Sequence, residues 1–134
     1  MTPGIYHLII YLPSDTNIKV GKLGHYNFPT GYYVYTGSAM RGLDQRIARH
    51  LRNDKHLHWH IDYLLQHGQI VDVITRMTKE HHECQFNQMI MSLPECQIPV
   101  KGFGSSDCDC LSHLTFFEKK PTLKSEKPLL VIIP

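Results

Sequence analysis

The sequence predicts an α/β domain in which a small, mainly antiparallel central sheet is flanked by helices. Its 134 residues match the usual size of one domain. Segments rich in β-branched and aromatic residues are interspersed with segments whose apolar residues recur at helical spacing. The expected order, β-β-α-α-β-α-β, lacks the regular strand–helix alternation of a doubly wound parallel sheet, and it therefore favours antiparallel pairing.

The first half of the chain predicts two main strands joined by a hairpin connection that contains additional short elements. Residues 4–12 are rich in β-branched and aromatic side chains and stop at a proline, as a strand does. Residues 32–36 repeat this composition, and we expect Gly37 and Ser38 to end that strand. Between the two, a short strand is expected over 18–20, with glycines and turn residues around it.

The second half predicts helices that alternate irregularly with strands. Leu43, Ile47 and Leu51 recur at i, i+4 and i+8, which is typical of an amphipathic helix. The other expected elements are a helix over 59–66, a strand over 70–74, a helix over 80–91, a loop over 99–109 and a strand over 114–117.

Composition narrows the classes of protein that fit. The formal net charge is only +2, so overall charge does not by itself indicate nucleic-acid binding. No segment approaches the ~20 apolar residues that span a bilayer, and the first residues do not have the pattern of a secretory signal. We therefore expect a cytoplasmic protein without membrane contact, in which the four cysteines stay reduced.

Several motifs occur together in an order that is more specific than any one of them. They are Gly4-Ile5-Tyr6, the run Tyr35-Thr36-Gly37-Ser38-Ala39, the pair Arg46 and His50 on the next helix, and the segments 57–64 and 102–108. In these motifs the chain resembles the GIY-YIG nuclease superfamily, and more closely its small stand-alone branch of Uri-type endonucleases. The resemblance covers residues 4 to about 117, so we expect a GIY-YIG-like nuclease domain over 1–117 and an extension over 118–134.

The resemblance implies a metal-dependent endonuclease that hydrolyses phosphodiester bonds, and it implies a role for each matching residue. Tyr6 would activate the attacking water, Tyr35 would order water and phosphate, and Arg46 would offer a permanent charge to phosphate oxygens. A glutamate on a later helix would hold Mg²⁺ or Mn²⁺. Gly37, Ser38 and His50 would support these groups. Catalysis of this kind depends mainly on positioning and electrostatics.

Two conditions apply to the tyrosines. Tyr6 and Tyr35 must emerge on one face of the sheet, and strand alternation puts Tyr33 and Tyr35 on the same face. An unperturbed tyrosine has a pKa near ~10, so as a base Tyr6 would need the metal or Arg46 to lower that value. The alternative is that both tyrosines are ordinary core residues of their strands.

Basic residues concentrate in and after the first helix. Residues 41–55 hold Arg41, Arg46, Arg49, Arg52 and Lys55 against Asp44 and Asp54. We assign Arg46 to the active site and the other four cations to DNA-backbone contacts. The alternative is a solvated helix face. His50, one turn after Arg46, could reach the same phosphate or simply be hydrogen-bonded.

The metal-binding glutamate is expected to be Glu83, with Glu80 as the alternative one turn earlier. Either could instead be an ordinary first-turn acid favoured by the helix dipole. A single carboxylate is adequate for Mg²⁺, since that ion keeps waters and substrate oxygens as its other ligands.

A second metal site is suggested by Cys108, Cys110 and His113, with Cys84 as a candidate fourth ligand. This set could hold a structural Zn²⁺, although reduced and partly buried cysteines are the alternative. The run of His56, His58 and His60 is expected to be structural or substrate-facing, not a metal site.

Three functions therefore compete. The leading one is a DNA endonuclease, with DNA favoured over RNA as the partner and with single-stranded or branched DNA as open possibilities. The others are a nucleic-acid-binding module that has lost catalysis and a zinc-stabilised interaction domain.

Overall fold

A computed structural model describes residues 2–105, 108 and 110–123 of the chain. Its centre is a four-stranded, fully antiparallel sheet in the order β5-β1-β4-β6. The strands are β1 (Gly4–Leu12), β4 (Gly31–Ala39), β5 (Gln69–Met77) and β6 (Leu114–Phe117). The expected α/β fold, with a small antiparallel sheet flanked by helices, is confirmed.

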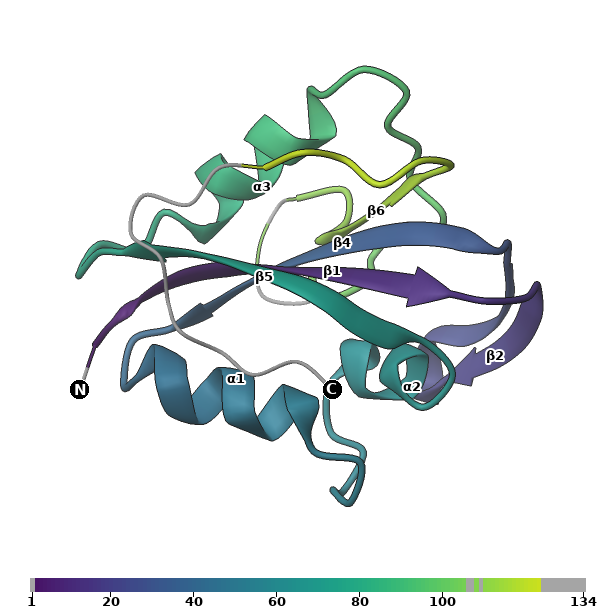
Figure 1. Ribbon diagram of the computed structural model, residues 1–134, viewed down its shortest axis with the longest axis horizontal. Helices are drawn as coiled ribbons and strands as arrows, with labels where there is room; N and C mark the ends of the chain where they lie inside the picture. Colours follow the sequence, from purple (N-terminus) through teal and green to yellow (C-terminus); the bar gives the residue numbers. More distant parts are fainter. Residues whose placement is uncertain (1, 106–107, 109, 124–134) are drawn as a thin grey trace.

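Helices cover both faces of this sheet (Figure 1). Helices α1 (Leu43–Leu51) and α2 (His60–Leu65) lie on one side, and α3 (Glu83–Met91) lies on the other. A separate hairpin of β2 (Thr16–Val20) and β3 (Gly24–Phe28), linked by the short helix η1 (Gly21–Leu23), packs against α2. None of the helices in the described part of the chain is long and apolar enough to cross a membrane.

The register of β1 against β4 decides which side chains meet. Tyr6 lies opposite Gly37, and Leu8 lies opposite Tyr35. Because side chains alternate along a strand, Tyr6, Tyr33 and Tyr35 all enter the core on the α1 side. The expectation that Tyr6 and Tyr35 share one face is confirmed.

The structure corrects several of the expected elements and bounds. The segment around Gly24 forms strand β3, because its backbone pairs with β2. Strand β4 continues through Gly37 and Ser38 to Ala39, because β1 supplies pairing partners as far as Gly4. Helix α3 begins at Glu83 and not at residue 80, since the Thr78 hydroxyl accepts the N–H of Glu80 in a preceding turn.

Strand β6 is shorter than β4, so one end of β4 has no β6 residue paired with it at the edge of the sheet. It pairs only with residues 32–35 of β4. Beyond that point, the N–H of Thr36 donates to the carbonyl of His113 at 3.0 Å. The edge of β4 around Gly37 and Ser38 is thus left to the loop before β6 and to the start of α3. Of the expected extension over 118–134, residues 124–134 lie outside the described part.

Candidate active site and metal cluster

Tyr6 lies at the centre of a buried group of aromatic side chains. Its ring is 6.3 Å from that of Tyr35 and 5.4 Å from that of His50, measured between centroids. The Tyr6 hydroxyl lies 2.7 Å from Nε2 of His50, within hydrogen-bond distance. Tyr6, Tyr35 and His50 come from β1, β4 and α1, so the fold joins three distant segments here.

Gly37 allows Tyr6 to occupy this position. A Cβ atom at residue 37 would lie 2.5 Å from the Tyr6 hydroxyl oxygen and 2.6 Å from Cζ. The tyrosine ring therefore packs directly on the glycine backbone opposite it in the sheet. Any larger residue would have to displace the ring.

Burial sets the protonation of these groups. Burial raises the pKa of Tyr6 well above its usual value, although the Arg46 charge opposes the rise. The pKa of Tyr35 is raised for the same reason. Burial lowers the pKa of His50 to about 3, with Asp62 opposing and nearby cations assisting. At neutral pH, His50 is therefore an uncharged ring beside a protonated phenol.

Arg46 points from α1 towards the open end of β4. Its Nη1 donates to the Ser38 carbonyl at 3.0 Å. Its guanidinium carbon lies 4.6 Å from the centroid of the Trp59 ring. These contacts fix the guanidinium within electrostatic reach of Tyr6 and Glu83.

Glu83 reaches the same place from the first turn of α3. Its Oε2 lies 2.8 Å from Nδ1 of His113. Burial alone would raise the pKa of this carboxyl, but hydrogen bonds from His113 and Ser38, with the Arg46 charge, hold the pKa below its usual value. Glu83 is therefore ionised. Glu80 is 74% exposed and interacts with His82.

The structure thus brings together the residues Tyr6, Tyr35, Gly37, Ser38, Arg46, His50 and Glu83. Of the four cations that the sequence analysis assigned to DNA contacts, two are instead held by contacts within the protein. Arg49 donates both terminal nitrogens to Asp62, each at 3.0 Å. Lys55 donates to the carbonyls of His50 and Arg52 at the end of α1.

Arg41 and Arg52 are exposed and remain available to a ligand. They line a hollow of about 520 Å³ on the outer side of α1, together with Arg46, Arg49 and Trp59. Since Arg46 extends inward from this hollow to Ser38, the basic surface is continuous with the buried group.

Asp62, which follows the histidine run in the sequence, has a structural role. It is fully buried, and Oδ2 also accepts the backbone N–H groups of His58 and Trp59. Together with Arg49 it fixes the start of α2 against α1. Arg49 also lies 4.2 Å from the Trp59 ring centroid, so this tryptophan contacts two guanidinium groups.

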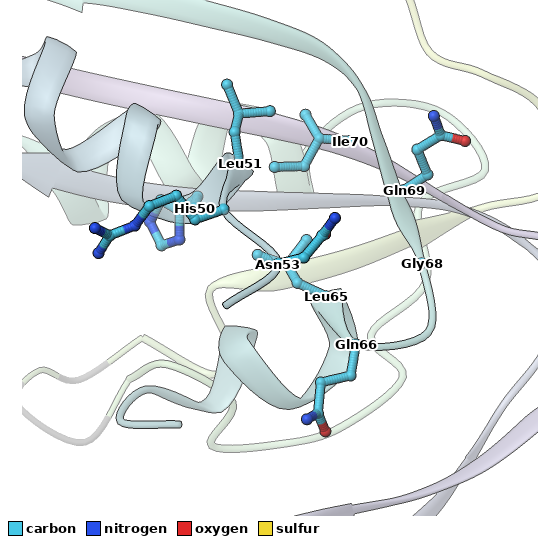
Figure 2. A pocket seen from close by; sticks show the side chains of 9 residues that line it. His50, Leu51, Asn53, Leu65, Gln66, Gly68, Gln69 and Ile70 are labelled. Atoms are coloured by element: carbon cyan, nitrogen blue, oxygen red, sulfur yellow. The ribbon is translucent and has the colours of Figure 1, made fainter. Parts of the chain in front are cut away.

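A separate hollow of about 310 Å³ lies between the ends of α1 and α2 and the start of β5 (Figure 2). His50 reaches it from one side, and Asn53, Leu65 and Ile70 line other parts. It does not include Tyr6, Arg46 or Glu83. The hollow therefore lies behind the catalytic candidates.

Four potential metal ligands gather beside Glu83. Sγ atoms of Cys84, Cys108 and Cys110 and a ring nitrogen of His113 all lie within 4.8 Å of one another. Nε2 of His113 is 3.2 Å from Cys108 Sγ and 3.8 Å from Cys84 Sγ. The cysteines are free, and the cluster could hold a metal ion.

Cys84 is the cluster member that the sequence pattern indicates least. It lies 24 residues before Cys108 in the chain, on a different element, and only the fold brings α3 to the loop before β6. Burial and the neighbouring Cys108 and Cys110 raise the pKa of Cys84. By contrast, hydrogen bonds from Cys110 and Cys84 and the charge of His113 outweigh burial and lower the pKa of Cys108.

The histidine run does not form a metal site within the described residues. His60 instead accepts the backbone N–H of Gly104 through Nδ1 at 2.8 Å. This bond ties the loop before β6 to α2.

One family profile matches the chain. It is described as Domain of unknown function DUF123, and it covers residues 5–131. The match extends past Phe117 into most of the C-terminal segment. No protein of curated function and no solved structure matches the chain.

Proposed function

The chain belongs to the DUF123 family, and within that family we propose that it is a divalent-metal-dependent endonuclease of the GIY-YIG type that hydrolyses phosphodiester bonds in DNA. One observation carries the proposal. Tyr6, Tyr35, Arg46 and Glu83, each assigned a role from the sequence motifs, come from four different elements and meet at the open end of β4. Four neighbouring residues chosen without regard to chemistry would not be expected to combine two phenols, a fixed cation and an ionised carboxylate.

The residues support a specific division of roles. The hydrogen bond to the uncharged His50 ring holds the Tyr6 hydroxyl, which is then placed to orient the attacking water. Arg46 neutralises charge on the phosphate as the leaving 3′ oxygen departs. Tyr35 lies beside Tyr6 and Arg46, and it orders the phosphate.

Glu83 fits the role of metal ligand. It is ionised and 29% exposed, so it can meet a hydrated cation at the surface. Mg²⁺ or Mn²⁺ held there would supply positive charge to the phosphate and to the leaving oxygen. Glu80 fits less well, because it lies outside α3 and is largely exposed.

We also propose that the cysteine–histidine cluster takes Zn²⁺. Three thiols and one imidazole are a usual donor set for tetrahedral zinc, in which nitrogen and sulfur ligands lie roughly 3.5 Å apart. The distances of 3.2 and 3.8 Å from His113 Nε2 to two of the sulfur atoms bracket that value.

The test is cleavage of labelled single-stranded, duplex and branched DNA in Mg²⁺ or Mn²⁺. Wild type should cut at least one substrate, and chelation of the divalent ion should stop it. Arg46→Ala and Tyr35→Phe should bind that substrate but cut it at least about 100-fold more slowly, a usual loss when a catalytic hydrogen bond or charge is removed. Failure of wild type to cut any of them would reject the endonuclease.

A binding module without catalysis is the second candidate. The observation in its favour is that Tyr6 and Tyr35 are only 1% and 8% exposed, so both tyrosines also serve the core. Under this alternative, DNA would be bound at the basic surface of α1 and never cut. Binding without cleavage in every metal would therefore favour it.

A further inference from the structure

The metal cluster and the proposed active site are joined at two points. Glu83 and Cys84 are neighbours in the first turn of α3, so one backbone segment carries a ligand for each site. In addition, the ring of His113 faces both sites. Its Nε2 points at Cys108 and Cys84, while its Nδ1 lies 2.8 Å from Glu83 Oε2.

We propose that a Zn²⁺ ion bound by Cys84, Cys108, Cys110 and His113 positions Glu83 for catalysis, with the His113 ring as the connection. The inference rests on the proposed nuclease function only for what Glu83 does, not for the connection itself. A histidine that binds a metal through Nε2 is uncharged and carries its proton on Nδ1. That proton is then available only to the acceptors that Nδ1 faces, of which Glu83 is the nearer.

This arrangement has the form of a carboxylate–histidine–metal series. Metal-binding histidines commonly donate their second ring nitrogen to a carboxylate or carbonyl, which fixes the orientation of the ring. Here Nδ1 also lies 3.1 Å from the carbonyl of Thr36, so the ring is anchored to β4 as well. The ion would hold His113 at Nε2, and His113 would hold Glu83.

The two side chains that form the connection differ in their exposure to solvent. The His113 side chain is 1% exposed, whereas that of Glu83 is 29% exposed. His113 thus fixes the carboxylate from the interior, and a catalytic ion can approach it from solvent. Without the ion in the cluster, Nε2 of His113 loses the partner that fixes the ring, and the position of the Glu83 carboxylate is less restricted.

The connection must act in both directions, because coupling between two sites is reciprocal. The first experiment measures Zn²⁺ affinity by competition with a chromophoric chelator, and it does not involve cleavage. Glu83→Ala should weaken Zn²⁺ binding by roughly 10–100-fold, as loss of a partner behind a metal ligand typically does. Glu80→Ala is the matched control, because that glutamate contacts His82 and not the cluster. It should bind Zn²⁺ as wild type does.

The second experiment measures Mn²⁺ binding at Glu83 by electron paramagnetic resonance. Cys110→Ser should lose the cluster ion and should bind Mn²⁺ more weakly. Cys96→Ser, which alters the cysteine outside the cluster, should change neither. Substitution of Co²⁺ for Zn²⁺ should give strong thiolate charge-transfer absorption in wild type and in Cys96→Ser.

The outcomes separate the two proposals. If Glu83→Ala binds Zn²⁺ as tightly as Glu80→Ala does, or if wild type binds no Zn²⁺, the positioning role is wrong. If zinc-free protein cuts DNA at the wild-type rate, the positioning role is also wrong, while the nuclease stands. A weakened Zn²⁺ affinity in Glu83→Ala, in a protein that cuts no nucleic acid, would support the connection and reject the nuclease. Should Cys110→Ser fail to fold, the comparison of Glu83→Ala with Glu80→Ala still decides.

Discussion

The Tyr6 hydroxyl lies 2.7 Å from Nε2 of His50, a residue 44 positions away in the chain and on the helix that also carries Arg46. Both partners are almost fully buried. Burial raises the pKa of Tyr6 and lowers that of His50 to about 3, so the pair is uncharged at neutral pH. The sequence suggested that Arg46 or the metal must lower the pKa of Tyr6. In the structure, burial outweighs Arg46, so Tyr6 keeps its proton and can act only through the hydrogen bonds of its hydroxyl group.

Tyr6→Phe should separate the chemical role of the hydroxyl from the packing of the ring. It removes the oxygen and leaves a buried ring nitrogen of His50 without this partner, which should cost about 1–3 kcal/mol of stability. The cleavage rate should fall by about 100-fold or more, since this is the usual loss when one positioned hydrogen-bonding group of an active site is removed. Thermal unfolding and single-turnover kinetics measure the two effects. An unchanged rate would remove Tyr6 from the mechanism.

Gly37→Ala should disturb the same tyrosine from the opposite strand. The added Cβ would meet the ring at 2.5–2.6 Å, and the ring is buried, so it cannot simply swing aside. Overpacking of this kind costs about 1–3 kcal/mol. We expect a lower midpoint of thermal unfolding together with slower cleavage. A variant as stable and as active as wild type would show that the ring does not depend on this contact.

Arg49→Ala and Arg52→Ala should have different effects, although the sequence placed them in one group. Arg49 pairs with the buried carboxylate of Asp62, so its removal leaves that charge unpaired and should cost about 3 kcal/mol of stability. Arg52 is exposed, so its removal should weaken DNA binding at nearly constant stability. The slope of log affinity against log salt should fall by about 1 for Arg52→Ala. A loss of stability in Arg52→Ala, with Arg49→Ala as stable as wild type, would contradict these roles.

Acid should destabilise the protein before its carboxylates titrate. Burial lowers the pKa of His50 to about 3 and, assisted by the Arg76 charge, that of His7 to about 4. In the unfolded chain both rings titrate near pH ~6.5, so between there and about pH 4 the unfolded state binds more protons. The free energy of unfolding should therefore fall as pH drops through this window. His50→Gln should show a smaller fall, measured by urea titration at several pH values, and an equal fall would show that His50 is not held uncharged.

The main sheet could be predicted from the sequence because its strands carry strong local signals. The runs at 4–12 and 32–36 are dense in β-branched and aromatic residues, and both became strands. Strand β3 has no such run, because exposed His25 and Asn27 alternate with other residues after Gly24. Its formation depends on pairing with β2, which composition does not report.

The motifs predicted most of the residues that gather at the candidate site, but they did not predict the contacts between them. The resemblance favoured Glu83, but the local sequence does not distinguish it from Glu80, since both suit a first helical turn. The turn formed by Thr78 and Glu80 places the helix start at Glu83 and directs that side chain to His113. Likewise, Cys84 and His113 are distant in the chain, and the ring that joins the cluster to the carboxylate becomes visible only in the fold.

In the proposed mechanism, Glu83 binds the ion used in phosphodiester cleavage. The single-turnover rate of DNA cleavage, measured as Mn²⁺ is varied for wild type, Glu83→Gln and Glu80→Gln, tests this role. We expect Glu80→Gln to follow wild type, whereas Glu83→Gln should need far more Mn²⁺ and should stay at least about 100-fold slower at saturation. A Glu83→Gln protein with the wild-type rate and Mn²⁺ dependence would exclude Glu83 as the ligand of the catalytic ion.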